Sequence, residues 1–184
     1  SSLSELKKRI ENSSTNPNDL SVRLGNITNV YNVFQHFYPY FDVINVNWEK
    51  ELETALKRCF TDKTDNDHLV TLQKFTAPLK DGHISVSGGS LGTYVPPFSW
   101  EWIENKLVIT EVWKDNIGIN IGDVVTKINH QTSEEYFAEI NSRISAGTKG
   151  WLNYRAKSKS LIGEKNENMS LEINGISHQF LHDF

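Results

Sequence analysis

The chain has 184 residues, of which 38% are hydrophobic and 23% charged, and its formal net charge is −4. This is the composition of an ordinary globular chain, and no apolar run approaches the roughly 18 residues of a membrane-spanning helix. Because Lys and Arg are scattered rather than clustered, no nucleic-acid partner is expected. The single cysteine, Cys59, excludes an intramolecular disulfide framework and a cysteine-rich zinc site.

The first 20 residues predict a polar N-terminal segment and linker. Residues 1–12 fit a short polar helix. Residues 13–19 contain Asn, Pro and Asp and are typical of a turn.

Residues 21–92 predict a helical domain that ends in a short strand and a Gly-rich hinge. Apolar residues recur every three or four positions from Leu24 to Phe37, which indicates one face of a helix. A second helix is expected after the N-cap Asn47, with Cys59 in its buried stripe. A third begins around residues 65–67, so these segments together predict a small antiparallel bundle.

The hydrophobic period changes after the bundle. Ile84 to Ser87 alternates like a short strand, and Gly88 to Gly92 supplies the hinge. Residues 93–184 then favour a second domain made mostly of strands.

The sequence of this second domain contains several strand and turn signals. Two β-type runs flank Glu104-Asn105 as a hairpin, another covers residues 124–128, and Asn174-Gly175 predicts a terminal hairpin. Thr132 and Glu135 form a capping box that opens one helix. The fold class expected is therefore α+β: a small N-terminal helical bundle followed by a PDZ-like β-rich domain with one capping helix.

Three segments in this order resemble the C-terminal-processing (tail-specific, tricorn-core-like) serine peptidase family. Residues 23–42 are similar to the opening helix of its N-terminal domain. The second segment is Leu79-Lys80-Asp81-Gly82-His83, and residues 118–129 (GINIGDVVTKIN) are similar to the PDZ signature with its Gly-Asp turn. The resemblance covers the chain from Arg23 to its end.

The resemblance implies a serine-type endopeptidase that acts on unfolded or C-terminally exposed polypeptides. Its catalytic serine lies in a domain downstream of the PDZ-like domain, so this chain alone is expected to be inactive. The implied partners are a polypeptide substrate or protein C-terminus and the downstream catalytic domain. No cofactor and no transmembrane segment are expected. Family habit implies a periplasmic or extracellular location.

His83 is the candidate catalytic residue. In tricorn-like members a His at the end of this segment is the general base, a role that suits imidazole because it exchanges protons near neutral pH. Other branches of the family use a Lys beside the serine. His83 is then structural, at a turn where Asp81 bonds to the backbone.

A PDZ-like domain binds a peptide as an added strand beside a helix. The resemblance places the groove edge at residues 97–103 and the opposing helix at residues 132–145. An ordinary core role is the alternative for each aromatic side chain, and the stretch lacks a Gly-Leu-Gly-Phe-like carboxylate loop. The peptide-binding candidates are Phe98, Trp100, Trp102, Tyr136, Phe137 and Ile140.

Two other patterns are interpreted as having no function. Gly88 to Gly92 matches G-x-S-x-G, but Pro96-Pro97 follows where a nucleophile elbow requires a helix, so Ser90 is not taken as a nucleophile. His178 and His182 could suggest a metal pair, but four residues apart in a predicted strand they would be about 13 Å from each other, too far for one ion. His36, His68 and His130 have no companion ligands in sequence, so no metal site is expected. The alternative to the peptidase is a non-enzymatic PDZ-type adaptor or scaffold.

Overall fold

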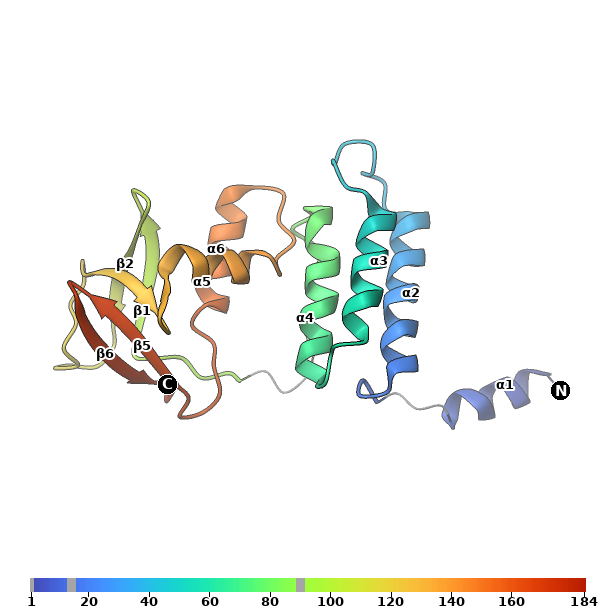
Figure 1. Ribbon diagram of the computed structural model, residues 1–184, viewed down its shortest axis with the longest axis horizontal. Helices are drawn as coiled ribbons and strands as arrows, with labels where there is room; N and C mark the ends of the chain where they lie inside the picture. The colour runs from blue at the N-terminus through green and yellow to red at the C-terminus, as the bar shows by residue number, and fades with distance from the viewer. Residues whose placement is uncertain (1, 13–15, 89–91) are drawn as a thin grey trace. The chain divides into compact units, whose positions relative to one another are not determined.

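A computed structural model describes residues 2–12, 16–88 and 92–184 and divides into two compact units, Ser1–Phe75 and Thr76–Phe184. Helices dominate the first unit and an antiparallel sheet the second, so the expected α+β class is confirmed (Figure 1). The sequence pattern places residues 76–92 in the helical domain. In the structure, the described residues of this range belong to the second unit. Among the helices of the described residues, none is both long and apolar enough to cross a membrane.

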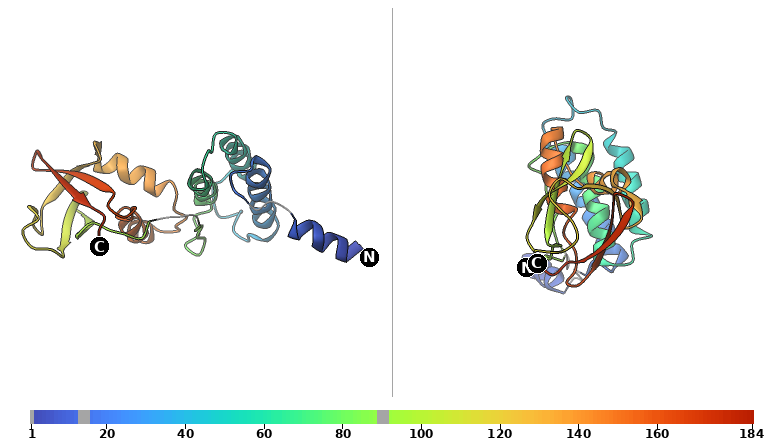
Figure 2. Two further views of the ribbon diagram at one scale, coloured as in Figure 1. Left: turned by 90° about the horizontal axis from the view of Figure 1, so that it is seen from below. Right: turned by 90° about the vertical axis from the view of Figure 1, so that its left-hand side faces the viewer.

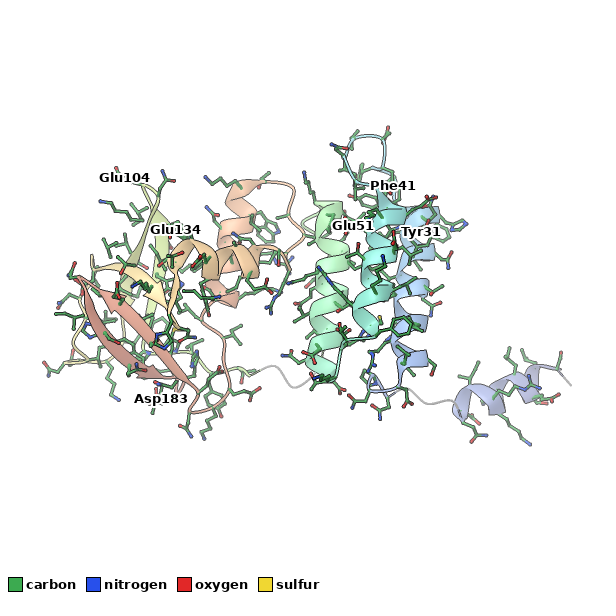
Figure 3. All side chains as sticks on the ribbon, in the orientation of Figure 1. Tyr31, Phe41, Glu51, Glu104, Glu134 and Asp183 are labelled. Carbon is green, nitrogen blue, oxygen red and sulfur yellow. The ribbon has the colours of Figure 1, made fainter. Side chains whose placement is uncertain are left out.

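The first unit is a bundle in which three helices lie side by side, preceded by one helix without buried residues (Figures 1 and 2). Trp48, the first residue of α3 (Trp48–Cys59), is stacked on Phe75 at 4.4 Å and on Tyr31 at 5.8 Å between ring centroids. Figure 3 labels Tyr31 and Phe41 at the end of the bundle where these aromatic rings gather. The helices are α1 (Ser2–Glu11), α2 (Leu20–Phe37), α3 (Trp48–Cys59) and α4 (Asp65–Thr76).

Local sequence signals set the ends of α3 as expected. The Asn47 side chain accepts a hydrogen bond from the Lys50 amide at 2.9 Å, which caps the first turn. Glu49 and Glu51 lie in that turn, where the helix dipole favours carboxylates. Cys59 ends the helix as a buried thiol, as predicted.

The second unit is built on one antiparallel sheet with the order β1-β2-β3-β5-β6, and the short β4 pairs with β3. Strand β1 therefore lies at an edge and has a partner strand on one side only within the described sheet. The strands are β1 (Phe98–Ile103), β2 (Lys106–Val112), β3 (Val124–Ile128), β4 (Gln131–Thr132), β5 (Asn168–Ile173) and β6 (Ile176–Leu181).

Both expected hairpins form. Glu104 and Asn105 have φ values of 49° and 61°, and Asn174 and Gly175 have 53° and 78°. Two successive positive φ values are the type I′ geometry that matches the twist of adjacent strands. A bulge between Ser99 and Trp100 shifts the β1–β2 register, so the buried residues 98–100 do not alternate.

Two helices, α5 (Ser133–Asn141) and α6 (Lys149–Lys159), pack on the sheet and on one another, α5 along β3 and β4 and α6 along β1 (Figures 1 and 2). The capping box that opens α5 is confirmed. Thr132 Oγ1 accepts from the Glu135 amide at 3.2 Å, and Glu135 Oε2 accepts from the Thr132 amide at 3.0 Å. Helix α6 was not expected, because its sequence has no strong apolar stripe and Ala156 is its buried residue.

The alternating pattern at Ile84 to Ser87 does not form a strand, so that prediction is wrong. The segment follows a short 3-10 helix, η1 (Ala77–Leu79), as irregular chain. Instead of pairing with a strand, the Ile84 carbonyl and the Ser85 hydroxyl accept hydrogen bonds from Arg155 of α6. A short alternating run has no preference for a strand unless the fold supplies a partner edge.

Candidate functional site

His83 lies in the turn after η1, paired with the carboxylate of Asp81. Asp81 Oδ1 accepts a hydrogen bond from the His83 amide at 2.9 Å and lies 3.1 Å from His83 Nδ1. The imidazole side chain is fully exposed, at 100%, whereas the Asp81 side chain is 22% exposed. The carboxylate is thus built into the turn and the ring projects from it.

This pairing serves both interpretations of His83. The backbone contact stabilises the turn, as the structural interpretation requires. The ring contact favours the tautomer with hydrogen on Nδ1, which leaves Nε2 as a proton acceptor. Among the described residues Nε2 has no hydrogen-bond partner, so it is open to an incoming hydroxyl group.

Helix α6 and the loop before it hold this turn in place. The Asp81 amide donates to Ser145 Oγ at 2.8 Å. A Cβ at Gly82 would lie 2.8 Å from Trp151 Nε1, so the backbone runs directly under the indole. Arg155 donates to the Ile84 carbonyl at 3.2 Å and to Ser85 Oγ at 2.9 Å. Contacts on both sides of His83 therefore connect it to a helix that the sequence pattern missed.

A groove of about 480 Å³ lies between β1 and α6, with Phe137 of α5 in its wall. Across it, Lys157 Nζ pairs with Glu101 Oε1 at 2.6 Å, so these two charged groups of its lining neutralise each other. Its lining is Trp100, Glu101, Trp102, Leu107, Phe137, Gly150, Asn153, Tyr154, Lys157 and Ser158.

A second hollow of about 470 Å³ continues beyond Trp102. It shares Trp102, Phe137 and Asn153 with the first, so the two form one depression along the edge strand. Figure 3 labels Glu104, on the β1–β2 hairpin, and Glu134, near the start of α5, both of which line this second hollow. The depression combines an aromatic floor with charged rims, the usual composition of a ligand site.

The structure brings three of the six predicted groove residues together. The rings of Trp100 and Trp102 lie 6.1 Å and 5.3 Å from that of Phe137, and all three residues line the groove. Trp100 is completely buried, so only Trp102 offers much surface to a ligand. The sequence reasoning missed Asn153, Tyr154 and Lys157, which lie on α6; the cap at Thr148 was the available signal for that helix.

The other three predicted residues lie in or against the core rather than in the groove lining. Phe98 is fully buried and packs edge-on against Phe180. Tyr136 donates its hydroxyl to the Ser160 carbonyl at 2.9 Å, and Ile140 is partly buried against the same core. Burial raises the pKa of the Tyr136 phenol to about 12, and the nearby Glu167 carboxylate acts in the same direction.

Ser90, which the sequence analysis set aside as a nucleophile, lies outside the described residues.

The fold is that of a helical part followed by an antiparallel β domain compatible with a PDZ-like arrangement. Solved structures of CPAF, a chlamydial serine protease, share it: mature CPAF has a TM-score of 0.62 at 12% identity over 87% of this chain. A serine-to-alanine mutant of CPAF gives 0.63, and CPAF complexed with lactacystin gives 0.58, both at 12% identity. The chain matches about one third of the CPAF chain, 33% for the mature protein. No protein-family model and no curated protein sequence matches it.

Proposed function

We propose that this chain is the substrate-binding and base-bearing front part of a serine-type endopeptidase. In this proposal Thr76–Phe184 presents an extended polypeptide, and His83 is the general base for a serine in a domain beyond residue 184. The likeness of fold to CPAF, a serine protease, supports a protease-related chain.

The observation that carries the proposal is the Asp81–His83 contact. A general base needs an oriented ring, a fixed tautomer and an open nitrogen. Asp81 Oδ1, 3.1 Å from Nδ1, supplies the first two, and the exposure of the ring supplies the third. The contacts to Ser145, Trp151 and Arg155 keep the turn in one place, which proximity catalysis requires.

The depression beside β1 is the proposed substrate site. Because β1 is an edge strand, its free side can pair with an extended peptide through main-chain hydrogen bonds. Trp102, Tyr154 and the edge of Phe137 then offer apolar surface for one or two side chains. Lys157 is already paired with Glu101, and Lys149 of the second hollow is the other lysine that lines the depression. We propose that the depression binds internal segments, which need no cation for a free carboxylate.

The catalytic half of the proposal is tested with the full-length protein and an unfolded polypeptide substrate. We expect hydrolysis, its loss by at least about 100-fold in His83→Gln, and covalent labelling by a serine-directed reagent. The matched control is His130→Asn, because His130 is also exposed and its φ of 69° suits Asn. Full activity in His83→Gln would rule out the general-base role.

The binding half is tested on the chain itself by tryptophan fluorescence with an apolar peptide, prepared as the free acid and as the C-terminal amide. Equal saturable binding of both, weakened about tenfold or more by Trp102→Ala, is the expected result. Trp113→Ala is the matched control, since Trp113 is exposed and contacts Glu111 outside the groove. Binding of the acid alone would instead indicate a reader of C-termini.

The adaptor alternative makes a different prediction for the same pair of experiments. Its groove would bind peptide with the Trp102 dependence described, because β1, β2, α5 and α6 of this chain supply the lining. The full-length protein would then show neither hydrolysis nor labelling by the serine-directed reagent. The expected periplasmic or extracellular location stays a prediction.

A further inference from the structure

A cysteine, an aspartate and a histidine meet where α3 passes into α4 in the first unit. Cys59 is the last residue of α3, Asp62 lies in the connecting turn, and His68 lies in the first turns of α4. One ligand atom from each lies within 4.8 Å of the other two. Sequence spacing alone showed no companion ligand for His68, whereas the turn brings two candidate donors to it.

Two polar atoms in this cluster face one another without a hydrogen bond. Asp62 Oδ2 and His68 Nδ1 are buried and lack a hydrogen-bond partner among the described residues. They lie 3.6 Å apart, which exceeds a hydrogen-bond length, and their side chains are 8% and 3% exposed. Buried polar atoms are nearly always satisfied in native proteins, so this pair requires an explanation.

The other polar atom of each side chain, Asp62 Oδ1 and His68 Nε2, contacts a neighbouring side chain. These contacts orient Asp62 Oδ2 and His68 Nδ1 towards each other. Thr71 Oγ1 donates to Asp62 Oδ1 at 3.0 Å. Asn26 Nδ2, a hydrogen-bond donor, lies 3.3 Å from His68 Nε2, so in this arrangement Nε2 accepts and Nδ1 carries the proton of the neutral ring. Metal binding at Nδ1 therefore includes a 180° turn of the Asn26 amide, after which its oxygen accepts from Nε2–H and Nδ1 has a free lone pair.

The donor set matches a zinc-type ion. Thiolate, imidazole and carboxylate are the three side-chain ligand types that zinc uses, with bonds of about 2.0–2.3 Å. Tetrahedral ligands at such bond lengths are separated by roughly 3.3–3.6 Å. The Asp62–His68 distance of 3.6 Å nearly fits already, and the sulfur, within 4.8 Å of both atoms, needs to approach them by about 1.2–1.5 Å at most.

Charge also fits such an ion. A thiolate, a carboxylate and a neutral imidazole around a divalent cation give a neutral complex. The neighbouring guanidinium of Arg23, which donates to the Cys59 carbonyl at 3.0 Å, therefore meets no net positive charge. Arg23 also donates to the Pro17 and Asn18 carbonyls at 3.1 Å and 2.9 Å. It therefore stabilises the end of α3 without being one of the proposed metal ligands.

We propose that Cys59, Asp62 and His68 form a binding site for a zinc-type divalent transition-metal ion, with a water molecule as the fourth ligand. The bound ion replaces the thiol proton, which passes to solvent, and joins α3 to α4 across their connecting turn. The site goes beyond the proposed peptidase function and does not depend on it.

The test is a titration of the chelator-treated chain with Co²⁺, followed by Zn²⁺. We expect a thiolate-to-cobalt charge-transfer band that saturates at one equivalent and disappears when Zn²⁺ displaces the cobalt. Cys59→Ser removes the band, whereas Asp62→Asn and His68→Gln weaken cobalt affinity at least about tenfold. Asn26→Ala, which removes the outer partner of His68, weakens it about 10- to 100-fold.

The control variant is His36→Gln, because His36 is an exposed histidine on α2 outside the cluster and should leave the titration unchanged. Circular dichroism of each metal-free variant checks that the bundle is folded. If Cys59→Ser unfolds the bundle, the isosteric Asp62→Asn variant still tests the proposal. The proposal is overturned if the folded chain gives no charge-transfer band, or if Asp62→Asn and His68→Gln both bind cobalt as tightly as the unmodified chain.

Discussion

The backbone of Gly82 runs directly beneath the indole of Trp151, with only 2.8 Å between Nε1 and the position of a Cβ at residue 82. This close approach connects the turn that carries His83 to helix α6. Five other residues of α6 line the groove: Gly150, Asn153, Tyr154, Lys157 and Ser158. The proposed base and the proposed substrate site therefore share one structural support. A change in α6 is expected to affect both.

Replacing Gly82 with Ala should separate activity from stability. The added methyl group must displace the indole, but Trp151 is 41% exposed and can move, so the free energy of unfolding should fall by only about 1 kcal/mol. Because the same methyl group shifts the His83 turn, kcat/KM of the full-length protein should fall about 10- to 100-fold. Denaturation and steady-state kinetics measure the two effects, and unchanged kinetics would contradict this coupling.

Gly92→Ala should be far more destabilising than Gly82→Ala. Its Cβ would lie 1.8 Å from the Gly163 carbonyl oxygen, in backbone that is hydrogen-bonded to Tyr94 and cannot swing away. A loss of about 3 kcal/mol is expected in urea denaturation. Gly25→Ala is the matched control, because nothing lies within 4 Å of that helical site and a gain of roughly 0.5–1 kcal/mol is expected.

Arg155→Met should loosen the segment after His83. The change keeps much of the side-chain stem but removes the donors to the Ile84 carbonyl and to Ser85 Oγ. Amide hydrogen exchange in residues 81–88 should accelerate, while exchange in the sheet core stays the same. In Arg143→Met, which removes a surface pair with Glu139 on α5, the exchange of residues 81–88 should not change.

Tyr136 should make the second unit sensitive to alkaline pH. Its pKa is raised to about 12 by burial, whereas an unfolded tyrosine ionises near 10. Between these values the unfolded state has lost the proton that the folded state keeps, so stability is fully present below pH 10 and falls as pH rises towards 12. Two pKa units correspond to about 2–3 kcal/mol.

The measurement is the free energy of unfolding between pH 9 and pH 12, together with the ultraviolet titration of tyrosine. Tyr136→Phe should abolish the part of the stability loss at alkaline pH that comes from Tyr136. It should also remove from the ultraviolet titration one phenol that ionises at high pH. An identical pH profile in Tyr136→Phe would show that other groups control alkaline stability.

Thr132→Ala should cost about 1 kcal/mol of stability. The change removes the oxygen that caps the Glu135 amide and the hydroxyl that donates to Glu135 Oε2, whereas the backbone amide of residue 132 can still donate to Glu135. Thr132→Ser retains the hydroxyl and should be nearly neutral. If the box acts as a unit, the losses in Thr132→Ala and Glu135→Ala will add to more than the loss in the double variant.

Sequence patterns predicted the elements whose causes are local. Asn47 and Thr132 set the starts of α3 and α5 because a cap acts within three residues. Glu104-Asn105 and Asn174-Gly175 set the hairpins because the turn itself requires positive φ. The helical bundle and the sheet-rich second part follow from these signals and from hydrophobic period.

The sequence by itself thus determined the α+β class, the order of the two parts and the identity of His83 as the residue to examine. Tertiary structure alone decided that Ile84 to Ser87 forms no strand, that α6 completes the groove, and that Cys59 and Asp62 reach His68. These features depend on contacts between distant positions or on the path of a turn. Periodicity in a single sequence records which face of an element is buried, but not which other residues bury it.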